Sequence, residues 1–328
     1  MLPIGNYKLT FVAKDRGAIR EHSGSAWRGL FGHSLKNTFC VTGQKECEHC
    51  LLYHSCGYVY LFETPPPPDT EKMRKYTSVP RPFIILPLQK ENKVLEPGDR
   101  FQVGFRLFGG ANRFLPHVIH SWRVAAKSGI GQRVHRSELT AVEQESEPGS
   151  GNWSTAFQSG NPFRHIPPVP PKTPGIPDSI RVILDSPLAL RRKGCIVNPE
   201  SFSFSDLFSS LLRRVSMLSY FHDEQSLEVD FSALTRQSKS IELIHPHLYW
   251  EKWMRYSSRQ KKTLCMRGIK GTFTLDPGQI ADFWPFLWVG QWTGTGKSTV
   301  MGQGQYRISP VSLEDYQNSI VSDRIGAG

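Results

Sequence analysis

The chain lacks any long apolar run. Among its 328 residues, no stretch approaches the roughly 18 consecutive apolar side chains that a membrane-spanning helix needs. The first residues also lack the charged-then-apolar pattern of a secretory signal peptide, because Lys8, Lys14, Asp15 and Arg16 interrupt it. We therefore expect a cytoplasmic protein with no membrane partner.

Cysteine is scarce, with six in the whole chain. In a reducing compartment these are thiols or metal ligands rather than a disulfide framework. Four of them form a compact cluster with a central Cys-x-x-Cys pair: Cys40, Cys47, Cys50 and Cys56. Such a cluster suits a structural zinc held by thiolates, and the alternative is a reduced cluster without metal. His49 or His54 could replace one sulfur. The two isolated cysteines, Cys195 and Cys265, are expected to be ordinary buried thiols.

One glycine is missing from an otherwise suggestive motif. Residues 290–306 contain five glycines, Lys297 and several hydroxyls, and the string Gly-Thr-Gly-Lys-Ser resembles part of a phosphate-binding P-loop. The P-loop spacing requires a glycine where this chain has Gln291. A nucleotide hydrolase is therefore the distant alternative. A loop that clamps a nucleic-acid backbone, or a plain hairpin connection, fits better.

Acidic residues are also in deficit. Asp and Glu number 29 against 40 Lys and Arg, which gives a formal net charge of +11. A surplus of this size attracts a polyanion and speeds the encounter with it, without specifying which polyanion.

Apolar patterning predicts two similar halves. In the first half we expect a helix over 26–38, capped by Ser25, and strands over the following ranges: 7–13, 57–62, 83–88 and 99–108. In the second half we expect helices over 206–221 and 279–288, with strands over the following ranges: 180–184, 227–231, 248–253, 268–275 and 306–308.

The least structured stretch, 143–178, is polar at first and then rich in proline. We expect it to link an N-terminal domain over 1–142, which holds the cysteine cluster, to a C-terminal domain over 179–328, which holds the glycine-rich loop. Each half opens strand, helix, strands. This order predicts an α+β protein of two tandem ferredoxin-like domains, each an antiparallel sheet with helices on one face.

Several strings then resemble one family. Residues 27–35, with the sequence WRGLFGHSL, are similar to the first-helix motif of the CRISPR precursor-RNA processing endoribonucleases, which belong to the RAMP superfamily. Residues 47–63 resemble the cysteine-bearing branch of that family. Further similarity lies at 211–215, 255–260, Gly268 and Gly271, and in the Gly-Gln-Gly of the terminal loop.

The resemblance implies an endoribonuclease with RRM-like domains that binds the hairpin of a CRISPR repeat. It implies one metal-independent cut per repeat in the precursor crRNA, without a catalytic cofactor. The 2′-hydroxyl would attack, leaving a 2′,3′-cyclic phosphate and a 5′-hydroxyl. The mature crRNA would be retained and passed to the subunits of a CRISPR effector complex. The alternative is a non-catalytic RAMP-like subunit that only binds RNA.

Histidine suits both proton-transfer roles in such a cut. His33 is the first candidate, because helical spacing turns it away from the apolar face and places Lys36 and Asn37 beside it. His54 is the second, with Tyr53 as its neighbour, and His22 is a weaker candidate. Some members of the family use arginine instead, so Arg20 and Arg28 are also candidates.

For RNA binding we expect basic side chains, one stacking tyrosine and the glycine-rich loop to act together. The predicted contacts are Arg213, Arg214, Arg255, Tyr256, Arg259, Lys261, Lys262, Arg267, Lys270, Gly294, Gly296, Lys297, Gly302 and Gly304.

Overall fold

Backbone contacts in the computed structural model separate the chain into two units. The structure describes residues 1–73, 76–89, 91–129, 135–257 and 262–310. The first unit contains residues 1–172 together with 216–227 and 300–302. The second contains 173–215, 228–299 and the described residues from 303 onward.

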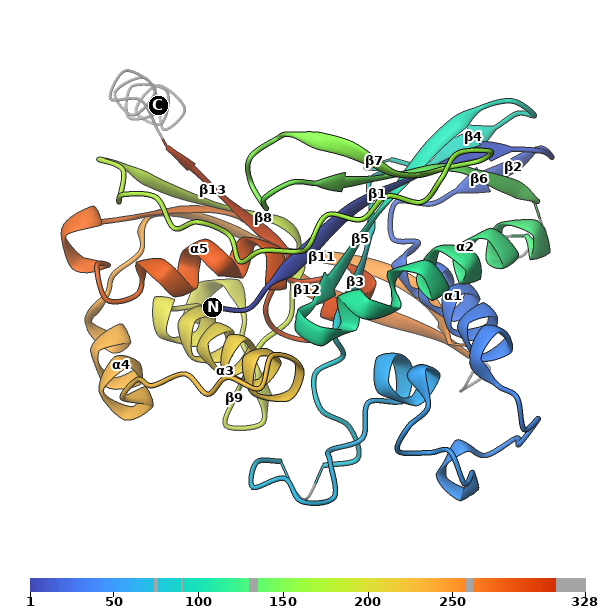
Figure 1. Ribbon diagram of the computed structural model, residues 1–328. Helices are drawn as coiled ribbons and strands as arrows, with labels where there is room; N and C mark the ends of the chain where they lie inside the picture. The colour runs from blue at the N-terminus through green and yellow to red at the C-terminus, as the bar shows by residue number, and fades with distance from the viewer. Residues whose placement is uncertain (74–75, 90, 130–134, 258–261, 311–328) are drawn as a thin grey trace. The chain divides into compact units, whose positions relative to one another are not determined.

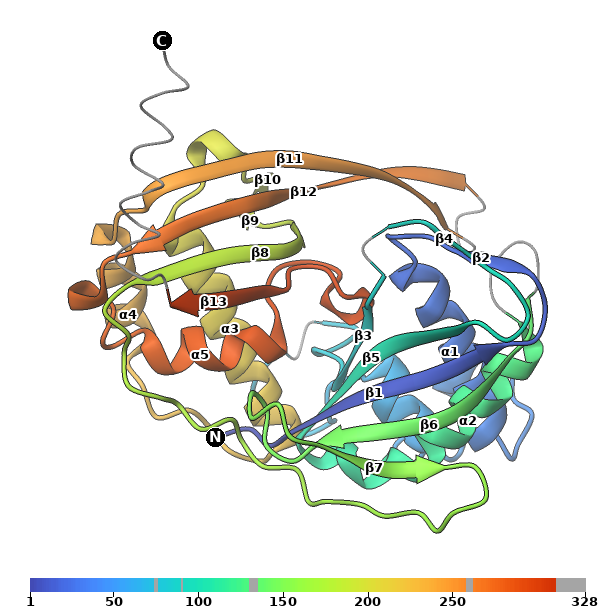
Figure 2. The ribbon, with the colours of Figure 1, turned by 90° about the horizontal axis from the view of Figure 1, so that it is seen from above.

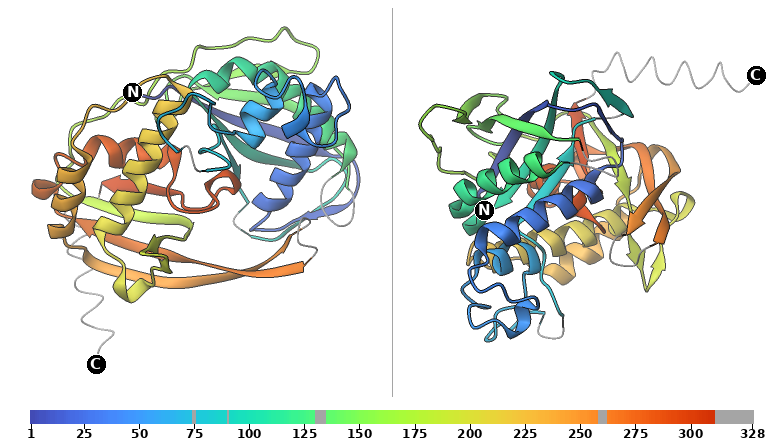
Figure 3. Two further views of the ribbon diagram at one scale, coloured as in Figure 1. Left: turned by 90° about the horizontal axis from the view of Figure 1, so that it is seen from below. Right: turned by 90° about the vertical axis from the view of Figure 1, so that its right-hand side faces the viewer.

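The first unit is built on a five-stranded sheet with the order β3-β5-β1-β6-β7, in which all neighbours are antiparallel (Figure 1). The strands of this unit are β1 (Ile4–Ala13), β2 (Gly17–Ile19), β3 (Phe83–Pro87), β4 (Lys93–Leu95), β5 (Arg100–Phe108), β6 (Ser137–Glu145) and β7 (Trp153–Gln158). Strands β2 and β4 form a separate small ribbon. Helices α1 (Gly24–Phe39) and α2 (Leu115–Ser128) pack side by side on one face of the sheet (Figure 3).

The second unit has a four-stranded sheet with the order β11-β12-β8-β13, again antiparallel throughout. The strands are β8 (Ile180–Leu188), β9 (Arg191–Arg192), β10 (Cys195–Ile196), β11 (Ile244–Ser257), β12 (Lys262–Leu275) and β13 (Tyr306–Pro310). Helices α3 (Phe204–His222) and α5 (Trp284–Thr293) cover one face of the sheet, and the short α4 (Phe231–Gln237) lies at its edge (Figure 2).

Both units therefore follow one plan. In each sheet, the first strand lies between the third and the fourth, and the second strand lies at an edge; β7 adds a fifth strand in the first unit. Two helices join these strands and cover a single face. This is the ferredoxin-like arrangement, and the prediction of two such units is confirmed.

The core of the first unit explains why α1 forms where it does. Trp27, Phe31 and Leu35 recur every four residues, and each is at most 1% exposed. The Phe31 ring stacks on Trp122 of α2, with 5.0 Å between the ring centroids. Each such side chain contributes about 1.5–3 kcal/mol through burial. The predicted cap at Ser25 is wrong, because the helix begins at Gly24 and Ser23 takes the cap position.

In the second unit, α3 and α5 meet through aromatic rings. The Phe208 ring of α3 lies edge-on to Phe283, which precedes α5, with centroids 4.7 Å apart. A second edge contact joins Phe208 to Phe286 within α5. These contacts fix α5 against α3, and α5 leads directly into the glycine-rich loop.

Three predicted segments differ in the structure. Residues 57–62 were expected to be a strand, but Val59–Glu63 form a π-helix. The Tyr58 hydroxyl donates to the Glu63 carboxylate at 2.9 Å. The two residues are five apart, which is the spacing of the backbone hydrogen bonds in a π-helix. Residues 227–231 are not a strand either. The Asp230 carboxylate accepts a hydrogen bond from the Ala233 N–H at 2.8 Å and begins α4.

The third difference lies in the expected linker, 143–178. Its first part holds the end of β6 and all of β7, which pair across residues 141–158. Val142 and Ala156 are buried, so alternating apolar residues anchor this hairpin to the sheet despite its polar composition. The later, proline-rich part contains no regular strand or helix among the described residues.

Candidate functional site

A basic groove lies within the second unit. It has a volume of about 510 Å³, and four of its lining side chains are cationic: Arg191, Lys252, Arg267 and Lys297. All four are exposed, and none of the described residues that line the groove is a carboxylate. Trp253 offers an aromatic face, and Ser298 and Gln303 offer hydrogen bonds. A groove with this lining attracts phosphate groups and can stack a base.

Strand register explains why two of these cations converge. Lys252 of β11 lies directly opposite Arg267 of β12, so both side chains project from the same face. The pairing of β12 with β8 begins only at Ile269, and residues 262–268 therefore form a two-stranded ribbon with β11 that extends beyond the sheet (Figure 2). The Arg267 guanidinium lies over the Trp250 ring at 4.8 Å, and this contact holds it in place.

The glycine-rich loop closes another side of the groove. Residues 290–293 belong to α5, so the loop begins at Gly294 and leads into β13. A P-loop requires the reverse order, a strand followed by a helix. The hypothesis of a nucleotide hydrolase is therefore wrong.

The backbone of this loop forms hydrogen bonds with other backbone groups of the protein. The Thr295 N–H donates to Gly304 O at 2.9 Å, and the Lys297 N–H donates to Ala189 O at 3.0 Å. The Gly304 N–H donates to Pro187 O at 3.1 Å. These N–H groups are therefore occupied within the protein. Lys297, by contrast, presents an exposed side chain to the groove.

The glycines of the loop shape its turn. Gly294, Gly296, Gly302 and Gly304 all have positive φ angles, between 59° and 80°. A Cβ on Gly304 would lie 1.8 Å from Thr295 O, inside the paired backbone. The predicted contribution of these glycines to RNA binding therefore becomes an indirect one, through the conformation that presents Lys297.

Gly290 has a different requirement, because a Cβ there would lie 2.0 Å from the Tyr306 hydroxyl and 2.8 Å from Leu211. We expect Gly290→Ala to lower the free energy of unfolding by about 1–3 kcal/mol, as overpacking does in other cores. Gly29→Ala is the matched control, since it lies in α1 with nothing within 4 Å of the added Cβ and alanine favours a helix. Urea denaturation of both variants measures the difference. Equal stability of the two would contradict this account.

The two predicted RNA contacts on α3, Arg213 and Arg214, lie in different environments. Arg213 is exposed. The Arg214 side chain donates through Nε to Thr293 O at the end of α5, at 2.7 Å, and burial lowers its pKa to about 10. Arg214 thus joins α3 to the carbonyl end of α5, and its role in RNA binding stays a prediction.

The other predicted contacts lie on or near the β11–β12 ribbon. Lys262 is exposed, and Arg255 is half-buried. Lys270 forms an ion pair with Glu251, with 2.9 Å between Nζ and Oε2, so it is not an open phosphate ligand. Tyr256 lies within β11, while Arg259 and Lys261 fall outside the described residues. Arg191, Lys252 and Trp253 of the groove were not predicted, because their convergence depends on strand pairing.

In the first unit, His33 is exposed on α1, and its Nε2 lies 3.4 Å from the Asn37 amide nitrogen. The predicted partnership with Lys36 is not formed. The Lys36 ammonium donates instead to Lys45 O at 2.8 Å and lies over the Tyr58 ring at 5.9 Å. His33 therefore remains an accessible imidazole with an amide neighbour.

The remaining catalytic candidates occupy several places. His54 is exposed and lies against the Tyr53 ring, in a turn rather than before a strand, and burial raises the pKa of Tyr53. Arg20 is exposed, and the Arg28 guanidinium lies over the Phe62 ring at 4.3 Å. His22 is half-buried just before α1.

The π-helix gathers a polar cluster that the sequence did not reveal. Tyr58 donates to Glu63, and the Arg81 Nε donates to Phe62 O at 2.5 Å. Burial lowers the pKa of Arg81, while the charge of Glu63 opposes this effect. This cluster fixes the segment that follows the cysteines.

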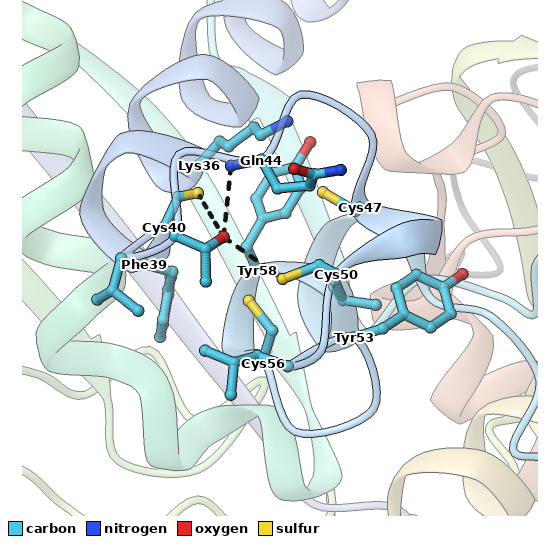
Figure 4. Close-up of a pocket in the computed structure, with 13 residues that line it drawn as sticks. Lys36, Phe39, Cys40, Gln44, Cys47, Cys50, Tyr53, Cys56 and Tyr58 are labelled. Atoms are coloured by element: carbon cyan, nitrogen blue, oxygen red, sulfur yellow. Dashed lines mark hydrogen bonds between the residues drawn. The ribbon is translucent and has the colours of Figure 1, made fainter.

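The four clustered cysteines line one small cavity, with Lys36, Thr42 and Tyr53 beside them (Figure 4). All four are half-buried free thiols. Hydrogen bonds from the N–H groups of Gly43 and Thr42 lower the pKa of Cys40, whereas burial raises the pKa of Cys47. Cys195 and Cys265 are exposed, so the expectation that they are buried is wrong.

Among the described residues, no helix is long and apolar enough to cross a membrane.

Comparison with solved structures shows which known proteins share this fold. A Cas6 product complex superposes with a TM-score of 0.54 at 14% identity, covering 94% of this chain and 99% of the other. Thermus thermophilus Cas6 superposes with a TM-score of 0.50 at 16% identity, with the same coverage of the two chains.

Longer chains contain the same fold. A partial Cas6-RT-Cas1–Cas2 complex matches with a TM-score of 0.51 at 14% identity over 96% of this chain. The present chain spans 47% of that protein, and 29% of the corresponding chain in the Cas6-RT-Cas1–Cas2 complex. At these identities the likeness establishes the fold alone. No curated protein sequence matches the chain.

Family models cover both units. Residues 2–170 match a model described as an N-terminal domain. Residues 182–306, which run from β8 to the start of β13, match the model of the CRISPR-associated endoribonuclease Cas6. Residues 182–306 therefore form a domain of the Cas6 family of CRISPR-associated endoribonucleases.

Proposed function

We propose that this protein binds the hairpin of a CRISPR repeat and cuts the precursor crRNA once in each repeat. The observation that supports it best is the basic groove, where Arg191, Lys252, Arg267 and Lys297 converge without a carboxylate, inside the region that matches the Cas6 model. Duplex RNA is recognised through its phosphates and its shape, which calls for converging cations rather than a base-reading motif.

The cut itself uses the RNA as its own nucleophile. A base removes the proton of a 2′-hydroxyl, the oxygen attacks the adjacent phosphorus, and an acid protonates the departing 5′-oxygen. The products are a 2′,3′-cyclic phosphate and a 5′-hydroxyl. His33 is exposed and free to exchange a proton with bound RNA, and an arginine such as Arg28 can stabilise the charged phosphorane.

The first test is cleavage of an end-labelled repeat RNA, with EDTA added together with the RNA and no added metal. We expect one cut and a product that carries a cyclic phosphate. A repeat with a single 2′-deoxy substitution at the nucleotide before the cut should bind equally well and remain intact. Cleavage of the deoxy substrate, or no cut in any repeat RNA, would refute the proposal.

One observation favours the alternative of a non-catalytic RNA-binding subunit. Lys36 is turned away from His33, so no charged partner accompanies this imidazole in the part of the chain that the structure describes. Both functions predict tight RNA binding, and cleavage alone separates them.

Retention of the product follows from the same groove, since its cations contact phosphates that remain after the cut. The cut RNA should therefore copurify with the protein and pass with it to the subunits of a CRISPR effector complex. Sequencing of the small RNA that copurifies would identify the repeat and the cut position together.

A further inference from the structure

The cysteine cluster forms a small site of its own in the first unit. Its four members come from one short segment between α1 and the π-helix, and all of them line a single cavity of about 20 Å³. Figure 4 shows the sulfur atoms turned toward a common space. A cavity of this volume accommodates one water-sized particle, which is too small for an organic ligand and suitable for an ion.

Backbone turns place three of the four cysteines of this cluster. Cys40 ends α1, and the next residues turn back through Gly43, which has a φ angle of 68°. Before this turn the Cys40 N–H donates to Lys36 O at 2.8 Å, which closes the last turn of α1. Cys47 and Cys50 occupy the ends of a 3-10 turn that is closed by the Cys50 N–H donating to Cys47 O at 2.9 Å. These two turns hold the backbone of Cys40, Cys47 and Cys50 in place.

The Thr42 hydroxyl stands between two of the sulfurs. It lies 3.4 Å from the Cys50 Sγ and 4.0 Å from the Cys40 Sγ. Thr42 is exposed, so its side chain can rotate outward without loss of packing. One polar atom between two of the four sulfurs therefore occupies a position that an ion can take.

The nearby histidines are turned elsewhere. The His49 Nε2 lies 3.4 Å from the Glu46 carboxylate, and its side chain is 70% exposed. The His54 ring lies edge-on to Tyr53 and is exposed. Neither residue lines the cavity. The sequence left open whether a histidine replaces one sulfur. Since neither histidine lines the cavity, the four sulfurs are the donors that it offers to an ion.

We propose that Cys40, Cys47, Cys50 and Cys56 bind one structural zinc ion as four thiolates. Four thiolate sulfurs are a donor set typical of structural zinc. The sulfurs would draw closer together around the ion, since no three of them lie within 4.8 Å of one another in the described structure. Binding converts the thiols to thiolates and releases their protons to solvent. Zinc with four thiolates carries a net charge of −2, and the Lys36 ammonium, which lines the same cavity, offsets part of it.

The position of the site explains what the ion would stabilise. The described residues of 40–56 contain no helix or strand apart from the turn at Cys47–His49. Only a few of its side chains, such as Cys47, Tyr53 and Cys56, contact the core of the unit. An ion that joins both ends of this segment removes much of its conformational freedom and anchors it beside α1.

The test starts with metal content. The full chain, produced in medium with added zinc and freed of loosely bound metal, should contain one zinc ion per chain. Cys50→Ser should lose that ion. The matched controls, Cys195→Ser and Cys265→Ser, change exposed cysteines outside the cluster and should keep it.

Two further measurements keep the proposal testable if Cys50→Ser folds poorly. Cobalt-substituted wild-type protein should show thiolate-to-cobalt charge transfer and the intense visible bands of a tetrahedral site. A thiol reagent should modify Cys195 and Cys265 quickly, and the four clustered thiols only after zinc has been removed. A folded wild-type protein without zinc, without the cobalt bands and with all its thiols equally reactive would overturn the proposal. None of these readouts depends on RNA cleavage.

Discussion

Replacing His33 with alanine should slow cleavage of a repeat RNA by about 10²–10⁴-fold, the range that one proton-transfer group contributes. His33 is exposed on α1, and its imidazole hydrogen-bonds to the Asn37 side chain, so its loss should leave the fold and RNA affinity unchanged. Single-turnover cleavage and filter binding on the same preparation separate the two effects.

The matched control for this variant is His120→Ala, because His120 is also an exposed histidine on a helix of the first unit. Its cleavage rate should equal that of the wild type. A His33→Ala variant with full activity would contradict the assignment. His54→Ala, Arg28→Ala and Arg20→Ala would then identify the group that acts instead.

Removing three groove cations together, with Arg191→Ala, Lys252→Ala and Arg267→Ala, should weaken RNA binding in a salt-dependent way. Each lost phosphate contact lowers the slope of log affinity against log salt concentration by about 0.7–0.9, so the triple variant should lose about 2–3 in slope. If the affinities converge near 1 M salt, a slope difference of 2 corresponds to about 10²-fold weaker binding at 0.1 M.

Arg236→Ala combined with Lys239→Ala controls for net charge alone. Both residues are exposed cations of the second unit, and neither lines the groove. For this double variant, the slope of log affinity against log salt concentration should differ from the wild-type slope by no more than about 0.7–0.9, the contribution of one phosphate contact. Equal slopes for the triple variant and the wild type would show that RNA binds elsewhere.

Local sequence patterns predicted a large part of this fold. The spacing of Trp27, Phe31 and Leu35 identified α1, and an apolar stripe identified α3 in the same way. Helix α2 was missed, although Pro116 in its first turn and the buried Val118, Ile119 and Trp122 carry a comparable signal. The strand predicted over 57–62 failed because aromatic and β-branched side chains also suit a buried π-helix.

The site was harder to predict for a physical reason. Lys252 and Arg267 become neighbours only through the register of β11 with β12, and Arg191 joins them from a separate short ribbon. The sequence also did not indicate the tertiary hydrogen bond from the Arg214 guanidinium to Thr293 O. Composition indicates the charge of a chain, but pairing between distant segments decides where that charge is placed.

The position of β13 in its sheet has a consequence for synthesis on the ribosome. This last described strand pairs with β8, which opens the same unit, and the buried Tyr306 side chain donates to Leu287 O in α5. Until residues 306–310 emerge from the exit tunnel, β8 keeps one open edge that can pair with another nascent chain. A message cut short just before Tyr306 should therefore yield an aggregating product, even though it encodes every groove cation described above.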